Sequence, residues 1–155
     1  MSISPQMQER IDRIESLIDK GYTLKETPFA NVDFRNSSGK RINTTFGSPA
    51  GFSWVTFFFS GIICARARVW SFFYIVGVAE IMLSLVHAIT KYDVSNFVGY
   101  AVPVWYGFMM PYLRKLNKDR GVKDLPMAWA IIGGIFLTMV AVLPSVFLDS
   151  IFDHM

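Results

Sequence analysis

Long apolar runs after residue 50 limit what this chain can fold into more than any other feature of its sequence. Before that point Lys, Arg, Asp and Glu are frequent, whereas from Gly51 onward nearly all charges lie in short clusters between apolar stretches. Over the whole chain 52% of residues are apolar and 17% are charged, whereas about a quarter are charged in a typical soluble domain. This distribution predicts a soluble N-terminal segment over residues 1–50 and a membrane domain over 51–155.

The apolar half contains four runs. The run over 52–65 is too short to cross a bilayer, which takes about 20 helical residues, so we expect an interfacial or re-entrant helix there. The runs over 69–89, 94–113 and 125–148 are each long enough to span. The sequence therefore predicts an all-α polytopic membrane protein with three transmembrane helices and one short membrane-associated helix. A four-span arrangement is the alternative.

The first 50 residues carry two further patterns. Over 5–20 apolar residues recur every three or four positions, which predicts an amphipathic helix with one apolar face: Met7, Ile11, Ile14 and Ile18. Its balanced charges favour docking onto protein, because helices that lie on membranes usually have a Lys- and Arg-rich polar face. Over 30–46 two alternating runs flank the turn-forming cluster Asn36–Gly39, which predicts a β-hairpin.

Basic residues predict the orientation of the membrane domain. They follow the first run and separate the third from the fourth, and the positive-inside rule makes both places cytoplasmic. The N-terminal segment, with seven basic residues, is then cytoplasmic and the C-terminus lies outside. This rule also explains the net charge of +3 without nucleic acid. We expect the basic belt to contact anionic lipid head groups through Arg66, Arg68, Arg114, Lys115, Lys118 and Arg120.

Three polar residues interrupt the second apolar run. Glu80 lies near its middle, where a carboxylate is costly and rarely faces lipid. Ser84 and His87 follow at four and seven residues, on the same helical face. Such a face can form a proton relay, or it can hydrogen-bond a neighbouring helix and fix packing.

Small and helix-bending residues recur every four positions in the third run. Small residues allow helices to approach closely, and prolines bend a helix and free backbone carbonyls. An ordinary kinked span and the broken helix of a transporter are both consistent with this ladder, which consists of Gly99, Pro103, Gly107 and Pro111.

Residues that could hold a metal or attack a substrate are few. Cys64 is the only cysteine and there are two histidines, so we expect no metal site and no cofactor. A metal site from Asp149, Asp153 and His154 is a weaker interpretation than a frayed terminus. No nucleotide-binding or hydrolase motif occurs. Enzymatic activity is the function class that the sequence supports least.

Two blocks resemble an uncharacterised family of small bacterial inner-membrane proteins of unknown function. The first block combines an aromatic run, a basic cluster and a tryptophan, and the second places aromatic residues before a basic helix end. The resemblance covers Gly51 to Lys118 and implies a bacterial inner membrane, without an activity or a cofactor. The two blocks are Phe52-Ser53-Trp54 through Phe59-Ser60-Gly61 to Arg66-Ala67-Arg68-Val69-Trp70, and Trp105-Tyr106 to Tyr112-Leu113-Arg114-Lys115-Leu116.

Two functions are consistent with these observations. The first is a membrane protein that acts by protein–protein interaction, as an accessory subunit, a regulator or an immunity-type protein, with a membrane or cytoplasmic protein as its partner. The second is an oligomeric channel or proton-coupled transporter in which several copies contribute Glu80. The surroundings of Glu80 distinguish them, because a polar cavity favours transport and dry contact with another helix favours assembly.

Overall fold

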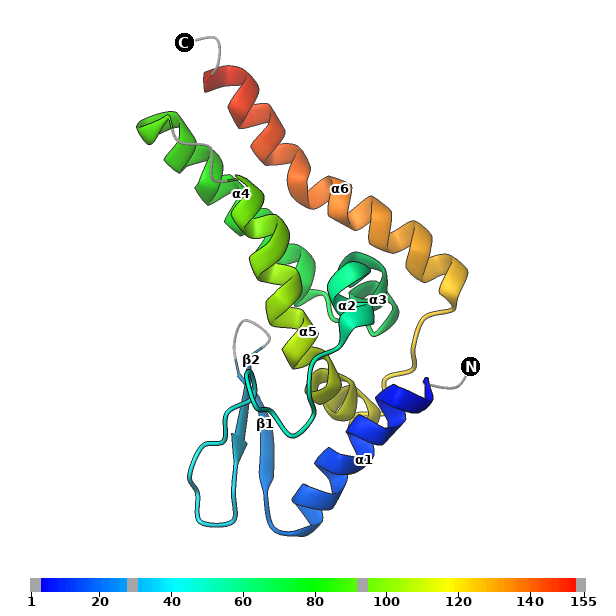
Figure 1. Cartoon of the computed structure of the whole chain (residues 1–155). Helices are drawn as coiled ribbons and strands as arrows, with labels where there is room; N and C mark the ends of the chain where they lie inside the picture. The colour runs from blue at the N-terminus through cyan, green and yellow to red at the C-terminus, as the bar shows by residue number, and fades with distance from the viewer. Residues whose placement is uncertain (1–3, 28–30, 92–94, 153–155) are drawn as a thin grey trace.

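The computed structural model describes residues 4–27, 31–91 and 95–152, and six helices and two strands lie in these ranges. Figure 1 shows a small helix-and-hairpin unit at one end and three long helices that extend from it toward the other end. The elements are α1 (Pro5–Asp19), β1 (Thr23–Thr27), β2 (Asn31–Arg35), α2 (Trp54–Phe58), α3 (Ser60–Arg66), α4 (Ser71–Thr90), α5 (Ser95–Asp119) and α6 (Met127–Phe152).

Helix α1 forms where the apolar periodicity predicts it. The side-chain oxygen of Ser4 accepts a hydrogen bond from the Met7 amide at 3.3 Å, and Pro5 occupies the first turn, where its missing N–H costs nothing. Met7, Ile11 and Ile14 are buried against the rest of the core. We call α1, the two strands and the loop up to Ala50 the cap.

The β-hairpin differs from the one predicted over 30–46. β1 pairs with β2 in antiparallel register, with Leu24 opposite Phe34. The Asn36–Gly39 turn does form, since the Asn36 side chain accepts from the Ser38 and Lys40 amides, but only an isolated bridge between Arg35 and Arg41 follows it. Residues 42–46 form no strand because Asn43 starts another turn, accepting a hydrogen bond from the Thr45 amide.

The short run over 52–65 becomes two helices, α2 of five residues and α3 of seven. The chain breaks at Phe59, whose backbone leaves the helical region. The Ser53 side chain caps α2, and the Ser53 amide donates to the Gly107 carbonyl at 2.8 Å, which fixes this segment to α5. Neither helix is long enough to span a bilayer.

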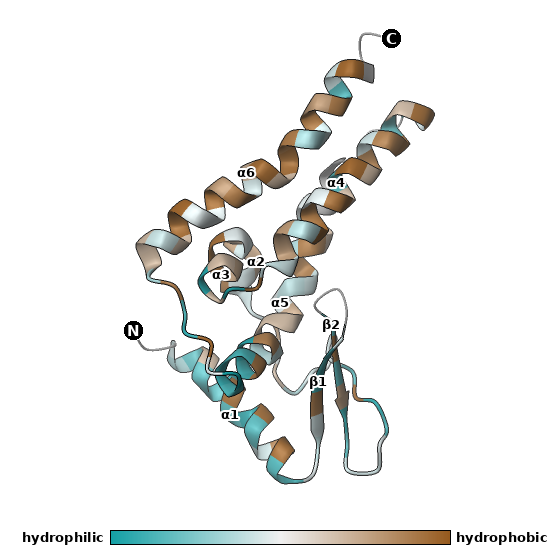
Figure 2. Ribbon diagram, turned by 180° about the vertical axis from the view of Figure 1, so that it is seen from behind, coloured by the Kyte–Doolittle hydropathy of each residue, from teal (hydrophilic) through white to brown (hydrophobic). Residues whose placement is uncertain are grey.

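Helices α4 and α6 are the two helices in the described ranges that are long and apolar enough to cross a membrane. They run in the same direction (Figure 1). Gly77 of α4 lies against Ala141 of α6, and Glu80, further along α4, lies near Asp149, further along α6. Only 22% of the most apolar window of α4, and 11% of that of α6, is buried. Figure 2 shows that hydrophobic residues predominate along both helices on the side seen there.

The third predicted span, over 94–113, is not supported, and with it the three-span prediction. The helix there, α5, extends to Asp119 and contains Pro103 and Pro111. Its second half is enclosed by protein, with Tyr106, Met109 and Tyr112 fully buried. The long apolar run that we attributed to lipid contact is therefore partly the core of the cap end, where α1, α2 and both strands pack on α5.

Candidate functional site

Charged side chains from three segments meet where the cap adjoins α3, α5 and the loop before α6. Arg66 ends α3 and Arg114 lies on α5, and Asp124, in the loop before α6, lies between them. Its Oδ2 is 3.6 Å from Arg66 Nε and 3.6 Å from Arg114 Nη2, which is close enough for ion pairs and too long for hydrogen bonds. The Leu125 amide donates to the Arg66 carbonyl at 2.9 Å and holds this loop against α3.

A third arginine comes from the cap. Arg10 of α1 lines a cavity of about 170 Å³ together with Arg66 and Arg114. The hydroxyls of Ser53 and Thr56, which lie 2.8 Å apart, line the same cavity. We call Arg10, Arg66 and Arg114 the arginine cluster.

Each member of the arginine cluster has a buried nitrogen with no hydrogen-bond acceptor among the described residues: Arg10 Nη1, Arg66 Nε and Arg114 Nε. A buried donor without an acceptor costs about 1–3 kcal/mol, and more for a charged group. The Arg114 side chain is only 8% exposed, so water does not compensate it readily. The cluster therefore has an excess of donors over acceptors.

Burial lowers the pKa of the Arg114 guanidinium; Asp124 opposes this shift, and the neighbouring Arg66 adds to it. Burial also lowers the pKa of Arg10, with a further contribution from Arg13 and an opposing one from Glu9. Both groups remain cations at neutral pH, because the ordinary pKa of an arginine lies far above 7. The surroundings of Arg10 and Arg114 thus carry too little negative charge to stabilise the two guanidinium cations.

The remaining basic residues of the predicted lipid-binding belt have other neighbours. Lys118 Nζ is 3.0 Å from Glu15 Oε1 of α1, and Lys115 is also paired with Glu15 and with Asp119. Arg120 Nη1 is 2.6 Å from a carboxylate oxygen of Glu26 on β1. Arg68 is exposed, with a positive φ of 56°. Three of the belt residues, Lys115, Lys118 and Arg120, therefore hold the cap on α5, and lipid contact by the belt stays a prediction.

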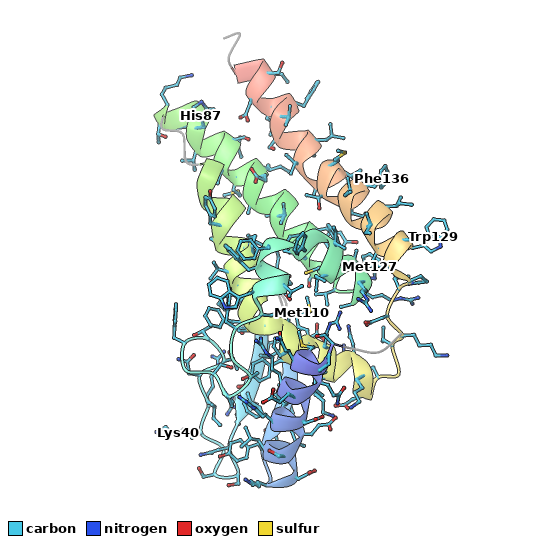
Figure 3. The ribbon with its side chains drawn as sticks, turned by 45° about the vertical axis from the view of Figure 1, so that its right-hand side comes forward. Lys40, His87, Met110, Met127, Trp129 and Phe136 are labelled. Carbon is cyan, nitrogen blue, oxygen red and sulfur yellow. The ribbon has the colours of Figure 1, made fainter. Side chains whose placement is uncertain are left out.

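Glu80, Ser84 and His87 lie on α4 toward the end remote from the cap, where Figure 3 labels His87. Glu80 is half-buried and Ser84 is buried. Helix α6 brings Asp149 close enough to Glu80 for an electrostatic interaction between the two carboxylates. In the described ranges neither carboxylate has a hydrogen bond or an ion pair.

The predicted ladder in α5 does not form a single surface. A Cβ on Gly107 would come within 2.4 Å of the Phe52 ring, so this glycine lets the start of the membrane domain pack on α5. Pro111 is fully buried, whereas Gly99 has open space around it. Pro103 lies between them and is half-buried.

The described residues do not meet the requirements of a metal site or of a reactive thiol. Among the described residues no three His, Cys, Asp or Glu side chains come together as a metal site. Asp153 and His154 of the weaker metal-site interpretation lie outside the described residues. Cys64 is fully buried, and this burial raises the pKa of its thiol, which makes it unreactive.

The sequence places Arg66 and Arg114 in one basic belt, whose charge Asp119 and Asp124 reduce, but it does not indicate Arg10 as their neighbour. Arg10 lies on the polar side of an amphipathic helix, and no local signal distinguishes it from Arg13. Only the docking of α1 on α5 brings Arg10 to the other two arginines.

Comparisons with protein families, with curated proteins and with solved structures find no match for this chain. The resemblance of Gly51 to Lys118 to small bacterial membrane proteins therefore stays a prediction.

Proposed function

We propose that this chain is an integral protein of a bacterial inner membrane, with the cap in the cytoplasm. The apolar surface of α4 and α6 supports this. The core helix of a soluble protein is mostly buried, whereas these two helices are mostly exposed, and soluble proteins rarely expose apolar patches of such size. Trp54, Trp70 and Trp129 are exposed at the amino-terminal ends of α2, α4 and α6, as expected of an aromatic belt at a membrane surface.

The path of the chain supports a specific topology. Because α4 and α6 run in the same direction, the segment between them must return to the cap side, and α5 makes this return beside α4 (Figure 1). We propose that the apolar part of α5 ahead of Arg114 makes the return crossing within the bundle, with α4 beside it, and that its basic carboxyl end emerges beside the cap. Arg66, Arg68 and the 114–120 segment then lie on the cytoplasmic side, and the C-terminus lies outside.

We propose that the protein acts by binding another membrane protein through the face of the α4–α6 pair that carries Glu80. The observation that supports this is the pair of Glu80 and Asp149, two carboxylates without a cation or a donor among the described residues. Within a membrane such groups are costly and usually pair with a neighbouring helix. A partner helix with a basic or hydrogen-bonding side chain supplies what this face lacks.

The alternative is an oligomeric channel or proton-coupled transporter in which several copies contribute Glu80. The same two carboxylates favour it, because they would line a polar path between copies. Helix α6 packs along α4 and brings Asp149 within electrostatic reach of Glu80. This contact with a helix supports assembly more than conduction.

The test is affinity purification of the full chain in mild detergent, with the mass of the complex measured by light scattering. We expect a stoichiometric membrane partner with the natural protein, its loss with Glu80→Lys, and its retention with Glu9→Lys, a control on the exposed side of α1. A monomer without partners would contradict the proposal. Proton flux in reconstituted vesicles that Glu80→Gln abolishes would establish the alternative.

A further inference from the structure

The cavity between the cap and the membrane domain combines features of a ligand site. Four elements line it, since Arg10 comes from α1, Thr56 from α2, Arg66 from α3 and Arg114 from α5. Its volume of about 170 Å³ is enough for several water molecules. A group the size of a phosphate therefore fits.

The charges around this cavity are unbalanced. It is lined by three guanidinium groups, and none of the described residues that line it is acidic. The nearest anion, Asp124, interacts with Arg66 and Arg114 from outside the lining. Glu9 next to Arg10 is already paired with Arg13 at 2.5 Å. The arginine cluster and Asp124 together carry a charge of about +2, because an arginine is always protonated.

The hydrogen bonds are also incomplete. Three buried guanidinium nitrogens, one from each arginine, lack an acceptor among the described residues. The Arg114 side chain is more than nine-tenths buried and lines the cavity. A tetrahedral oxyanion presents several acceptor oxygens at once, and the planar guanidinium matches phosphate oxygens better than other cations do.

We propose that the arginine cluster binds a phosphate group in this cavity. The three guanidinium groups donate to the phosphate oxygens, and one of the two mutually bonded hydroxyls of Ser53 and Thr56 supplies a further donor. The bound phosphate bridges the cap to the membrane domain, because Arg10 belongs to the first and Arg66 and Arg114 to the second.

This phosphate can come from two sources. Trp54, which is 63% exposed, lines the cavity and belongs to the aromatic belt, so the head group of a phospholipid in the cytoplasmic leaflet reaches it. A soluble phosphate ester reaches the same cavity from the aqueous side of the cap. The arginine cluster would bind the phosphate of a lipid head group and of a soluble ester in the same way, and the experiment below distinguishes the two ligands.

The experiment uses the full chain in detergent and in nanodiscs. Inorganic phosphate is titrated against the delipidated protein, with thermal unfolding as the readout. In parallel, nanodiscs of phosphatidylcholine with and without phosphatidic acid are compared by native mass spectrometry of the lipids that stay bound after release. A stabilising shift with inorganic phosphate identifies a soluble ligand, and retained phosphatidic acid without such a shift identifies a lipid head group.

Arg10→Gln is the decisive variant, because Arg10 makes no ion pair within the described ranges and we expect the fold to tolerate its replacement, which the unfolding temperature without ligand checks. We expect it to weaken phosphate or phosphatidic acid binding about tenfold, which is one charge-assisted contact. Lys20→Gln, at the exposed end of α1 and outside the cavity, removes the same charge and should bind like the natural protein. Arg66→Gln, with Arg68→Gln as its control, repeats the test from the membrane side.

Absence of binding in both arms would overturn the proposal. Equal weakening by Arg10→Gln and Lys20→Gln would also overturn it, since the effect would then come from the net charge of the protein and not from the cavity.

Discussion

Phenylalanine has opposite surroundings at the two ends of this molecule. Phe34 in the cap is fully buried between the rings of Tyr22 and Tyr112, with centroids 5.7 and 5.6 Å away. Phe136 on α6 is 63% exposed, and Figure 3 shows it, with Trp129, on the side of α6 turned away from the other helices. The cap therefore folds as proteins fold in water, whereas the surface of α6 is suited to a solvent that is itself apolar.

The two ends also differ in how they are held together. The cap is attached to α5 by ion pairs between elements far apart in sequence, such as Glu15 with Lys118 and Glu26 with Arg120. Helix α6 relies instead on close backbone contact at small residues, with Ala141 against Gly77 of α4 and Gly134 against Gly61 of α3. This is the usual difference between water, which drives apolar burial, and lipid, where helices associate through packing.

The largest expected effect is that of replacing a phenylalanine in the cap, and the same replacement on α6 is its control. Phe34→Ala should lower the free energy of unfolding by about 3–5 kcal/mol, because it removes a fully buried ring from a closed core. Phe136→Ala should change it by less than about 0.5 kcal/mol in detergent, since it removes only a lipid-facing side chain. Denaturant titration in micelles measures both, and equal losses would contradict the contrast between the ends.

A lysine introduced on α6 or on the cap tests whether each surface faces lipid or water. Phe136→Lys places an ammonium group on the apolar face of α6, at a cost of about 2.5–3.5 kcal/mol near a membrane centre. Thr23→Lys, at an exposed position of β1, should be neutral. The fraction of protein that resists carbonate extraction from membranes measures insertion. Full retention of the Phe136→Lys protein would mean that this face does not meet lipid.

Replacing a glycine of α6 with alanine adds a methyl group and tests how closely α6 packs on α3. A Cβ on Gly134 would lie 2.9 Å from the Gly61 carbonyl oxygen and from Ile62 Cα, whereas a Cβ on Gly133 meets nothing within 4 Å. Gly134→Ala should destabilise the protein by about 1–3 kcal/mol, as overpacking does. Gly133→Ala should have no such cost, because the position is open. Thermal unfolding of both variants in one detergent decides the question, and a Gly134→Ala variant as stable as its control would argue against this contact.

The smallest effect concerns pH and the attachment of the cap. The hydrogen bond from Lys118 lowers the pKa of Glu15; burial opposes this, and the charges of Lys118 and Lys115 add to it. A lowered carboxyl pKa stabilises the folded state above the unfolded value near 4.3, and this contribution disappears as pH falls through the folded pKa. Between pH 6 and 3 the stability difference between the natural protein and Glu15→Gln should shrink from about 0.2–1 kcal/mol toward zero. If this stability difference grew as the pH fell, the pKa of Glu15 would be raised in the folded state, which would contradict the prediction.

The sequence predicted elements with strong local signals. Helix α1 follows from its apolar spacing and Ser4 cap, and α4 and α6 follow from long apolar runs. Strand β1 was missed because Thr23–Thr27 has a single apolar residue, Leu24. The third run was predicted to lie in lipid, but an apolar run does not show whether lipid or protein surrounds it, and the second half of α5 is enclosed at the cap end.

The candidate site was predictable only in part. Arg66 and Arg114 are conspicuous because they follow apolar runs, and Glu80 because it interrupts one. The partners Arg10, Asp124 and Asp149 come from other elements, and their proximity depends on packing that no local pattern encodes. The sequence therefore indicated individual charged residues, whereas the arginine cluster depends on the fold.

The most direct test of the central claim is labelling of introduced cysteines with a membrane-impermeant maleimide. The natural Cys64 is fully buried, so it contributes little background. We expect Lys40→Cys to react only in inside-out vesicles, Lys91→Cys only in right-side-out vesicles, and Phe136→Cys in neither until detergent is added. Labelling of Phe136→Cys as fast as Lys40→Cys in intact vesicles would show that α6 faces water and would contradict the account.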